Sequence, residues 1–114
     1  MKGLKKKFLP AFAGLADGFR DSGIRVQYIL ALCAVMAGFV LKLSAGEWIA
    51  VIVCIGMVVA SEMLNTCIEK LCDLYTMEED ARIKIIKDLA AGAVLVAGAA
   101  SLACAIIILI RHIS

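Results

Sequence analysis

Proline is almost absent from this chain of 114 residues, because the single proline, Pro10, lies near its start. No proline therefore interrupts the later apolar segments, and no inverted repeat is visible, which argues against a transporter. The net charge of +2 is too small to indicate a nucleic-acid-binding protein. The five cysteines form no CxxC pair, which argues against a zinc site and a disulfide framework. They lie in apolar segments, at Cys33, Cys54, Cys67, Cys72 and Cys104.

Hydrophobic residues, in contrast, make up 63% of the chain, and the mean hydropathy is +0.97. Soluble domains contain roughly 45–50% apolar residues, and a protein this short cannot bury a larger share inside itself. We therefore expect an integral membrane protein. Its length allows one domain, covering residues 1–114.

Three apolar segments are predicted to cross the membrane as helices, over about 26–42, 47–74 and 83–111. The first is short against the ~20 residues that a crossing needs, but Arg25 and Lys42 can extend from its ends to the interface. The last is the clearest, since Leu89 to Ile110 contains no charged residue. Thr76 with Glu79 fits a capping box that starts this last helix. The expected fold class is all-α.

An amphipathic surface helix is predicted before the first span, over about residues 4–22. Three lysines precede an apolar run of only nine residues, which contains Pro10 and leads into Asp17, Arg20 and Asp21, and this argues against a signal peptide. Apolar side chains instead recur every three or four residues, which is typical of a helix lying in the membrane surface. These side chains are Leu4, Phe8, Phe12, Leu15 and Phe19.

Positive charge is distributed unevenly between the two sides of the predicted membrane. Ten of the twelve lysines and arginines belong to the N-terminal segment or the 70–88 loop, and only Lys42 and Arg111 lie on the other side. By the positive-inside rule, the N-terminus is predicted to be cytoplasmic. The expected location is the bacterial inner membrane.

Four polar residues form a stripe on the second span. Glu62, Asn65, Glu69 and Asp73 fall within an arc of about 80° at 100° per residue. Ionisable groups at membrane depth are costly and usually functional. A solvated helix end would explain Asp73 and Glu69, but not Glu62, which follows the apolar run almost directly. The stripe predicts a functional site at the interface.

The segments Glu62-Met-Leu-Asn65-Thr-Cys-Ile-Glu69-Lys-Leu-Cys-Asp73 and Lys87-Asp88-Leu-Ala-Ala91-Gly-Ala-Val-Leu together resemble the signature of the prokaryotic diacylglycerol kinase and undecaprenol kinase family. The resemblance covers essentially the whole chain. The second segment is similar to the Gram-positive-type members, for which undecaprenol is the usual substrate.

The resemblance implies a homotrimer with shared sites, in which ATP and Mg²⁺ serve to phosphorylate a membrane lipid alcohol, undecaprenol before diacylglycerol. Glu62 is implied as the catalytic base, and Asp21 and Glu69 as metal ligands. Asn65, Asp73 and Ala91 are implied to orient the site. The implied ATP contacts are Asp21, Glu69, Glu78, Glu79, Asp80, Lys87 and Asp88.

Two classes other than a kinase remain open on the residues alone. A small transporter or ion-coupling subunit would use Glu62 as a proton site. A membrane scaffold would use the polar stripe only to specify helix pairing.

Two positions depart from the family pattern. The family usually has a glutamate four residues before the arginine that opens the first span, and Asp21 stands there in this chain. Many members carry an asparagine two residues before that arginine, where this chain has Gly23. The carboxylate of Asp21 is therefore about one methylene nearer to its backbone.

Overall fold

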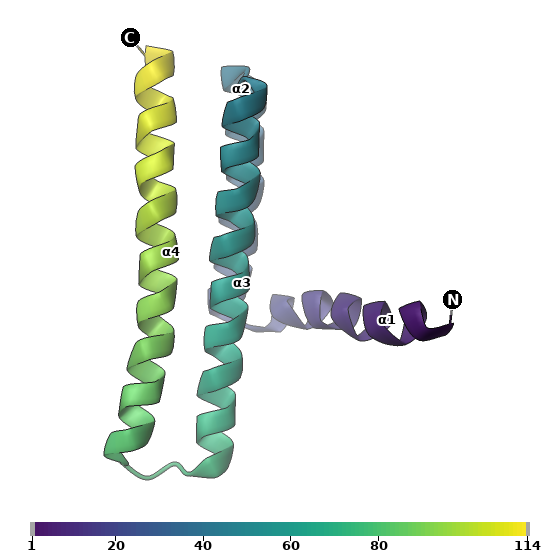
Figure 1. Ribbon diagram of the computed structural model, residues 1–114, viewed down its shortest axis with the longest axis vertical. Helices are drawn as coiled ribbons and strands as arrows, with labels where there is room; N and C mark the ends of the chain where they lie inside the picture. Colours follow the sequence, from purple (N-terminus) through teal and green to yellow (C-terminus); the bar gives the residue numbers. More distant parts are fainter. Residues whose placement is uncertain (1, 114) are drawn as a thin grey trace.

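The computed structural model describes residues 2–113, and every regular element within them is helical (Figure 1). A first helix and a short 3₁₀ turn precede three long helices, each of which is long and apolar enough to cross a membrane. This confirms the predicted all-α membrane fold. The elements are α1 (Lys2–Asp17), the 3₁₀ turn Gly18–Arg20, α2 (Ser22–Leu41), α3 (Ala45–Tyr75) and α4 (Ala81–Ile113).

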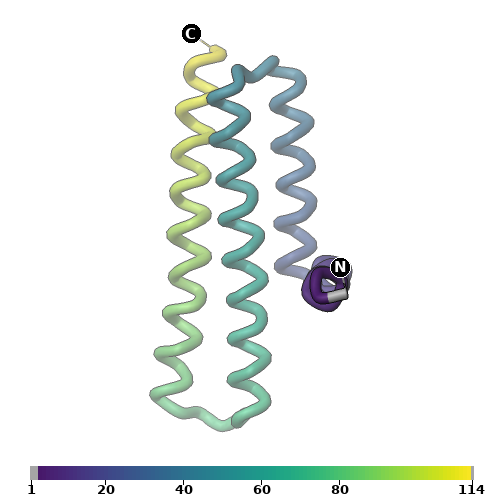
Figure 2. The backbone as a smooth tube through the Cα atoms, turned by 45° about the vertical axis from the view of Figure 1, so that its right-hand side comes forward, coloured from purple at the N-terminus to yellow at the C-terminus, as the bar shows by residue number. Residues whose placement is uncertain are grey.

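The three long helices run side by side, and α3 lies between the other two (Figure 2). Contacts between helices are most extensive where α3 packs on α4, and α2 packs on the other flank of α3. Helix α1 extends away from this bundle and across its long axis (Figure 1). The apolar side chains of α1, among them Phe8 and Phe12, are consequently exposed, as expected of a helix that lies on a membrane surface.

A compact elbow holds α1 against the start of α2. The Tyr28 hydroxyl donates a hydrogen bond to the Leu15 carbonyl at 2.8 Å, and the Tyr28 ring packs edge-on against Phe19 at 4.8 Å. The Arg25 guanidinium donates to the Phe19 carbonyl at 3.1 Å. Gly18 is buried beneath Tyr28, where a Cβ atom would collide with the hydroxyl. These contacts hold α1 near the plane where α2 begins.

Two boundaries differ from the sequence-based prediction. The first helix ends at Asp17, not near residue 22, because Asp21 is extended and caps α2. The capping box at Thr76 is wrong: Thr76 ends α3, with its N–H donating to the Cys72 carbonyl at 3.0 Å. Asp80 takes the capping role for α4, since its carboxylate accepts a hydrogen bond from the Arg82 N–H at 2.8 Å. Asp80 lies directly before the helix, and Thr76 is too far from it.

The opposite end of the bundle is closed by a polar clasp that joins α3 to α4. Ser44 and Glu47 form a capping box at the start of α3. The Glu47 carboxylate also lies 3.0 and 3.1 Å from Nε2 of His112, in the last turn of α4. Glu47 is buried, with an exposed fraction of 6%. A buried carboxylate requires such partners, so this contact fixes how the ends of the two helices align.

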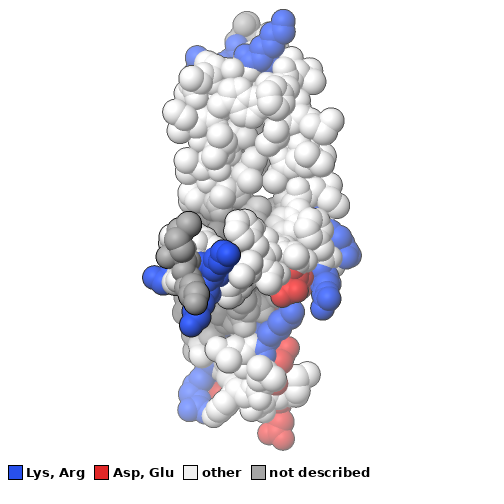
Figure 3. Space-filling model, turned by 90° about the vertical axis from the view of Figure 1, so that its right-hand side faces the viewer, with Lys and Arg blue, Asp and Glu red and all other residues white. Residues whose placement is uncertain are grey.

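Charged side chains mark the level at which the molecule meets the membrane. On the face shown in Figure 3 they gather at α1 and in the half of the bundle beyond it. The other half is uncharged apart from its far end, where Lys42 and Arg111 lie. The uncharged belt therefore lies between α1 and the α2–α3 turn. The α3–α4 hairpin extends past α1 on the other side (Figure 1).

Removing the clasp should destabilise the protein without altering its chemistry, because the clasp lies at the far end of the bundle. We expect His112→Ala and Glu47→Ala each to lower the free energy of unfolding by about 1–3 kcal/mol, the usual effect of leaving a buried polar partner unsatisfied. Unfolding in a detergent titration measures the free energy of each variant. The double variant then gives the interaction energy between Glu47 and His112, as the difference between its loss and the sum of the two single losses. Strict additivity of the two losses would contradict the clasp.

Candidate active site

Glu62 lies beside the start of α2, at the boundary of the uncharged belt. A Cβ atom on Gly23 would lie only 2.7 Å from the Glu62 Oε1 atom and 3.3 Å from the Asp21 Oδ1 atom. One carboxylate from α3 and one from the residue that caps α2 therefore converge on the space left by one glycine. Asp21 and Glu69 are the negatively charged neighbours of Glu62. The structure thus brings three residues of the predicted site close together.

Asp21 has a structural task in addition to its place near Glu62. Its Oδ1 atom accepts a hydrogen bond from the Ile24 N–H at 3.0 Å and so caps α2. Ile24 is itself buried, at 5% exposure, so the capped turn is firmly packed. The cap uses one carboxylate oxygen of Asp21.

One turn further along α3, Asn65 and Glu69 form a pair. The Asn65 amide donates a hydrogen bond from Nδ2 to Oε1 of Glu69 at 3.1 Å. The Asn65 side chain is buried, and its Oδ1 atom accepts no hydrogen bond from the described residues. A buried acceptor without a partner costs about 1–3 kcal/mol. This oxygen is therefore suited to receive a donor or a cation that comes with a ligand.

The cations of α4 are paired with carboxylates. Lys87 Nζ lies 2.8 Å from the Asp73 carboxylate and so bridges α4 to α3. Lys84 pairs with Asp88 at 2.7 Å, one turn along α4. Both pairs are substantially exposed, and exposed pairs are worth roughly 0–1 kcal/mol. An anionic ligand can therefore displace these carboxylates from the two lysines at small cost.

The acidic residues of the α3–α4 turn lie at the tip of the hairpin, about 20 Å along α3 from Glu62 at 1.5 Å per residue. Glu78 and Glu79 are exposed. The pKa of the Asp80 carboxyl is lowered by hydrogen bonds from the Arg82 side chain and backbone. Ala91 is exposed on α4, one turn beyond Lys87. Within one copy, the structure does not bring the acidic residues of this turn to Glu62.

The oxygen donors near Glu62 suit a hard cation, although a single copy does not form a complete cation site. Carboxylate and amide oxygens are the ligands that Mg²⁺ prefers. Asp21, Glu62 and Glu69 supply the carboxylates, and Asn65 supplies the buried, unpaired Oδ1 atom. Among residues 2–113, however, no group of three histidine, cysteine, aspartate or glutamate side chains is arranged to hold an ion. The residues present fit Mg²⁺ by their chemistry.

Comparison with known proteins decides the family. A family model described as prokaryotic diacylglycerol kinase matches residues 10–109. The chain belongs to this family. The chain is also 38% identical over 92 residues to the undecaprenol kinase of Bacillus subtilis (strain 168), a match that covers 80% of this chain and 75% of that protein. The protein is therefore a lipid kinase, and the transporter and scaffold alternatives are set aside.

For this kinase, sequence reasoning noted Gly23 only as a departure from the family pattern and did not place it beside Glu62. The pairing depends on how α2 packs against α3, which no spacing along the chain reveals. The clasp at Glu47 was missed as well, although Ser44-x-x-Glu47 has the spacing of a capping box. That spacing could have predicted the start of α3.

A methyl group at residue 23 should displace the Glu62 carboxylate. We expect Gly23→Ala to keep or slightly raise stability, since alanine favours helix over glycine by about 1 kcal/mol. Lipid kinase activity should fall by roughly tenfold or more, because displacements of about 1 Å have large kinetic effects. Steady-state kinetics and detergent unfolding measure the two quantities.

Gly46→Ala is the matched control, because Gly46 is also the second residue of its helix and a Cβ there meets nothing within 4 Å. Full activity in Gly23→Ala would show that catalysis does not depend on the space that Gly23 leaves for the Glu62 carboxylate.

Proposed function

We propose that this lipid kinase transfers the γ-phosphoryl group of ATP to the primary hydroxyl of a membrane lipid alcohol. The observation that carries the proposal is the position of Glu62, where the uncharged belt ends and the charged hairpin begins. A lipid hydroxyl reaches this level from the bilayer, and a nucleotide reaches it from water. Phosphoryl transfer requires both groups in line at one point.

Glu62 is proposed as the general base. Its carboxylate accepts the proton of the lipid hydroxyl while the hydroxyl oxygen bonds to the γ-phosphorus and the bond to the departing ADP breaks. Such proton transfer typically contributes 10²–10⁴-fold in rate. Asn65 supports this arrangement by holding Glu69 through the hydrogen bond from its Nδ2 atom.

The charged half of the site serves the nucleotide. Glu69 and Asp21 would hold Mg²⁺, which would neutralise phosphate charge. Asp73 would hold Lys87 in position until the nucleotide binds, and Lys87 would then exchange Asp73 for a phosphate oxygen. Asp88 is paired with Lys84, so this ion pair would have to break before Asp88 contacts the nucleotide. The tip residues Glu78, Glu79 and Asp80 complete the proposed ATP contacts, and Ala91 lies among the orienting groups.

A homotrimer with shared sites is proposed from the family resemblance, with the N-terminus in the cytoplasm of a bacterial cell. Two features support sharing. The tip acids lie far from Glu62 within one copy, and no complete cation site forms among residues 2–113. Ten positive charges on one side of the belt support the orientation.

Undecaprenol is proposed as the substrate, and diacylglycerol is the second candidate. Support comes from the relative named undecaprenol kinase. Both lipids present a primary hydroxyl to the interface, so the proposed chemistry is the same for each.

The proposal is tested by incubating purified protein with labelled ATP, Mg²⁺ and either lipid in mixed micelles. We expect phosphorylated undecaprenol to form faster than phosphatidate. Glu62→Gln should lower kcat by at least about 10²-fold, because the amide cannot accept the proton. A folded wild-type protein that phosphorylates neither lipid would refute the proposal, whereas an active Glu62→Gln variant would refute only the assignment of the base.

Asp21→Asn separates the two tasks of this side chain. Asparagine caps helices about as well as aspartate, so stability should stay within a few tenths of a kcal/mol. The loss of one negative ligand should raise the Mg²⁺ concentration needed for half-maximal activity by roughly tenfold or more, because Mg²⁺ prefers carboxylate oxygens. Asp21→Ala, the comparison variant, should also lose about 0.5–2 kcal/mol from the cap. If Asp21→Asn leaves the Mg²⁺ dependence unchanged, Asp21 is not a metal ligand and serves only as the cap of α2.

A further inference from the structure

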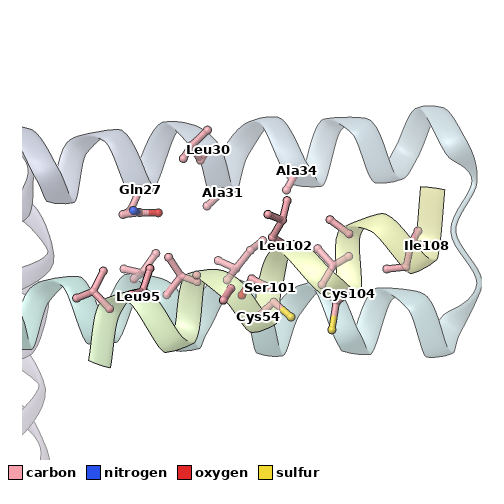
Figure 4. Close-up of a pocket in the computed structure, with 18 residues that line it drawn as sticks. Gln27, Leu30, Ala31, Ala34, Cys54, Leu95, Ser101, Leu102, Cys104 and Ile108 are labelled. Carbon is pink, nitrogen blue, oxygen red and sulfur yellow. The ribbon is translucent and has the colours of Figure 1, made fainter. Parts of the chain in front are cut away.

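Two cysteines from different helices lie next to each other in the uncharged belt. Cys54 belongs to α3 and Cys104 to α4, and both line an apolar groove between α2 and α4 (Figure 4). Neither thiol is part of a disulfide bond, and the two thiols share a hydrogen bond. Figure 4 likewise shows their two sulfur atoms close together. The proposed kinase chemistry uses neither cysteine.

The alignment of α3 with α4 explains why these two residues meet. The contact between Glu47 and His112 fixes the antiparallel alignment at one end of the hairpin. Cys54 lies seven residues after Glu47, and Cys104 lies eight residues before His112. Nearly equal steps along antiparallel helices keep residues at one level, because the rise per residue is the same. The ion pair between α3 and α4 near the other end of the hairpin gives nearly the same alignment.

Cys104 also lies on the side of α4 that is buried. Ala90, Ala97 and Cys104 recur every seven residues, and positions seven apart share one side of a helix. The two alanines are buried, and α3 is the helix that packs most extensively on α4. Small residues let helix backbones approach closely. A disulfide requires such an approach, with Cα atoms about 4.4–6.8 Å apart.

We propose that Cys54 and Cys104 are a site of oxidation, where an organic hydroperoxide dissolved in the membrane produces a disulfide bond between α3 and α4. One thiol first attacks the hydroperoxide: the O–O bond breaks, the sulfur becomes a sulfenic acid, and the alcohol leaves with the thiol proton. The second thiol then attacks the sulfenic sulfur. The S–S bond forms as the S–O bond breaks, and water leaves. This inference is independent of the proposed kinase function.

The position of the pair selects an oxidant that dissolves in lipid. Cys54 precedes Glu62 by eight residues, so the pair lies about 12 Å inside the belt at 1.5 Å per residue. Charged redox reagents are excluded from this depth, because an unpaired charge in an apolar medium is very costly. An uncharged hydroperoxide has no such barrier. A neighbouring thiol captures a sulfenic acid before it is oxidised further.

Packing alone is the competing explanation, because a free cysteine usually behaves as a small apolar side chain. Under that explanation the two thiols would only fill space between α3 and α4. Oxidation would then produce no bond between them, since buried structural cysteines are inert. The two explanations therefore differ in a covalent product that can be measured directly.

The test treats the assembled protein in lipid bilayers with one equivalent of cumene hydroperoxide. The protein is then denatured, its remaining thiols are alkylated, and its peptides are analysed by mass spectrometry. We expect the chain to lose two hydrogen atoms and to yield a linked peptide that contains Cys54 and Cys104. Free thiol at both positions should fall nearly to zero and return after treatment with tributylphosphine, a reductant that dissolves in lipid.

Serine variants identify the partners of the bond. Cys33→Ser is the matched control, because Cys33 is a cysteine of α2 that is exposed outside the groove; this variant should yield the linked peptide as the wild type does. Cys54→Ser leaves Cys104 without its partner. We expect no bond within the chain of this variant, and a sulfenic acid at Cys104 that dimedone traps. Cys104→Ser should behave in the same way at Cys54.

Three results would overturn the proposal. The first is full retention of both thiols in the wild type after oxidation, which would leave packing as their only role. The second is equal loss of thiol at Cys33, Cys54 and Cys104 without a linked peptide, because the pair would then have no special reactivity. The third is a bond that joins two chains, seen as a dimer in electrophoresis without reductant.

Discussion

The lengths of α3 and α4 impose the constraint from which the rest of the architecture follows. With 31 and 33 residues, these helices are about 46–50 Å long at 1.5 Å per residue, whereas the hydrocarbon layer is about 30 Å thick. One end of the hairpin must therefore leave the membrane. The elbow between α1 and α2 selects the end, because Tyr28 and Gly18 hold the amphipathic helix at the level where α2 begins. Glu62 lies at that level, and Glu69 and Asp73 lie beyond it.

Features set by position along a single helix were predictable from the sequence. The three apolar segments, the amphipathic N-terminal helix and the common face of the polar stripe all depend only on helical periodicity. The hydrogen bond from Asn65 to Glu69 joins two residues of that face, four residues apart, but the stripe alone did not predict it. The sequence also set Glu62 apart from the solvated end of the stripe, but where α1 meets the bundle is a feature of the fold alone.

Contacts between helices could not be read from the sequence. Glu47 and His112 are separated by 65 positions, and each looks like an isolated polar residue at the end of an apolar run. Lys87 and Asp73 were both candidates for the site, but their ion pair exists only because α4 folds back along α3. The error at Thr76 has a local cause. Its hydroxyl does accept a hydrogen bond, from the Glu78 N–H at 3.0 Å, yet this bond forms a turn after α3 instead of a cap on α4.

The two departures from the family pattern, Asp21 and Gly23, belong to one spatial arrangement. Both face Glu62, and the point where a Cβ on Gly23 would stand is close to both carboxylates. A side chain at residue 23 would compete for the space that the Glu62 carboxylate occupies. An aspartate at residue 21 keeps its oxygen within reach of the Ile24 N–H, and capping strongly favours this short side chain. The shorter acid and the missing side chain together leave room beside Glu62.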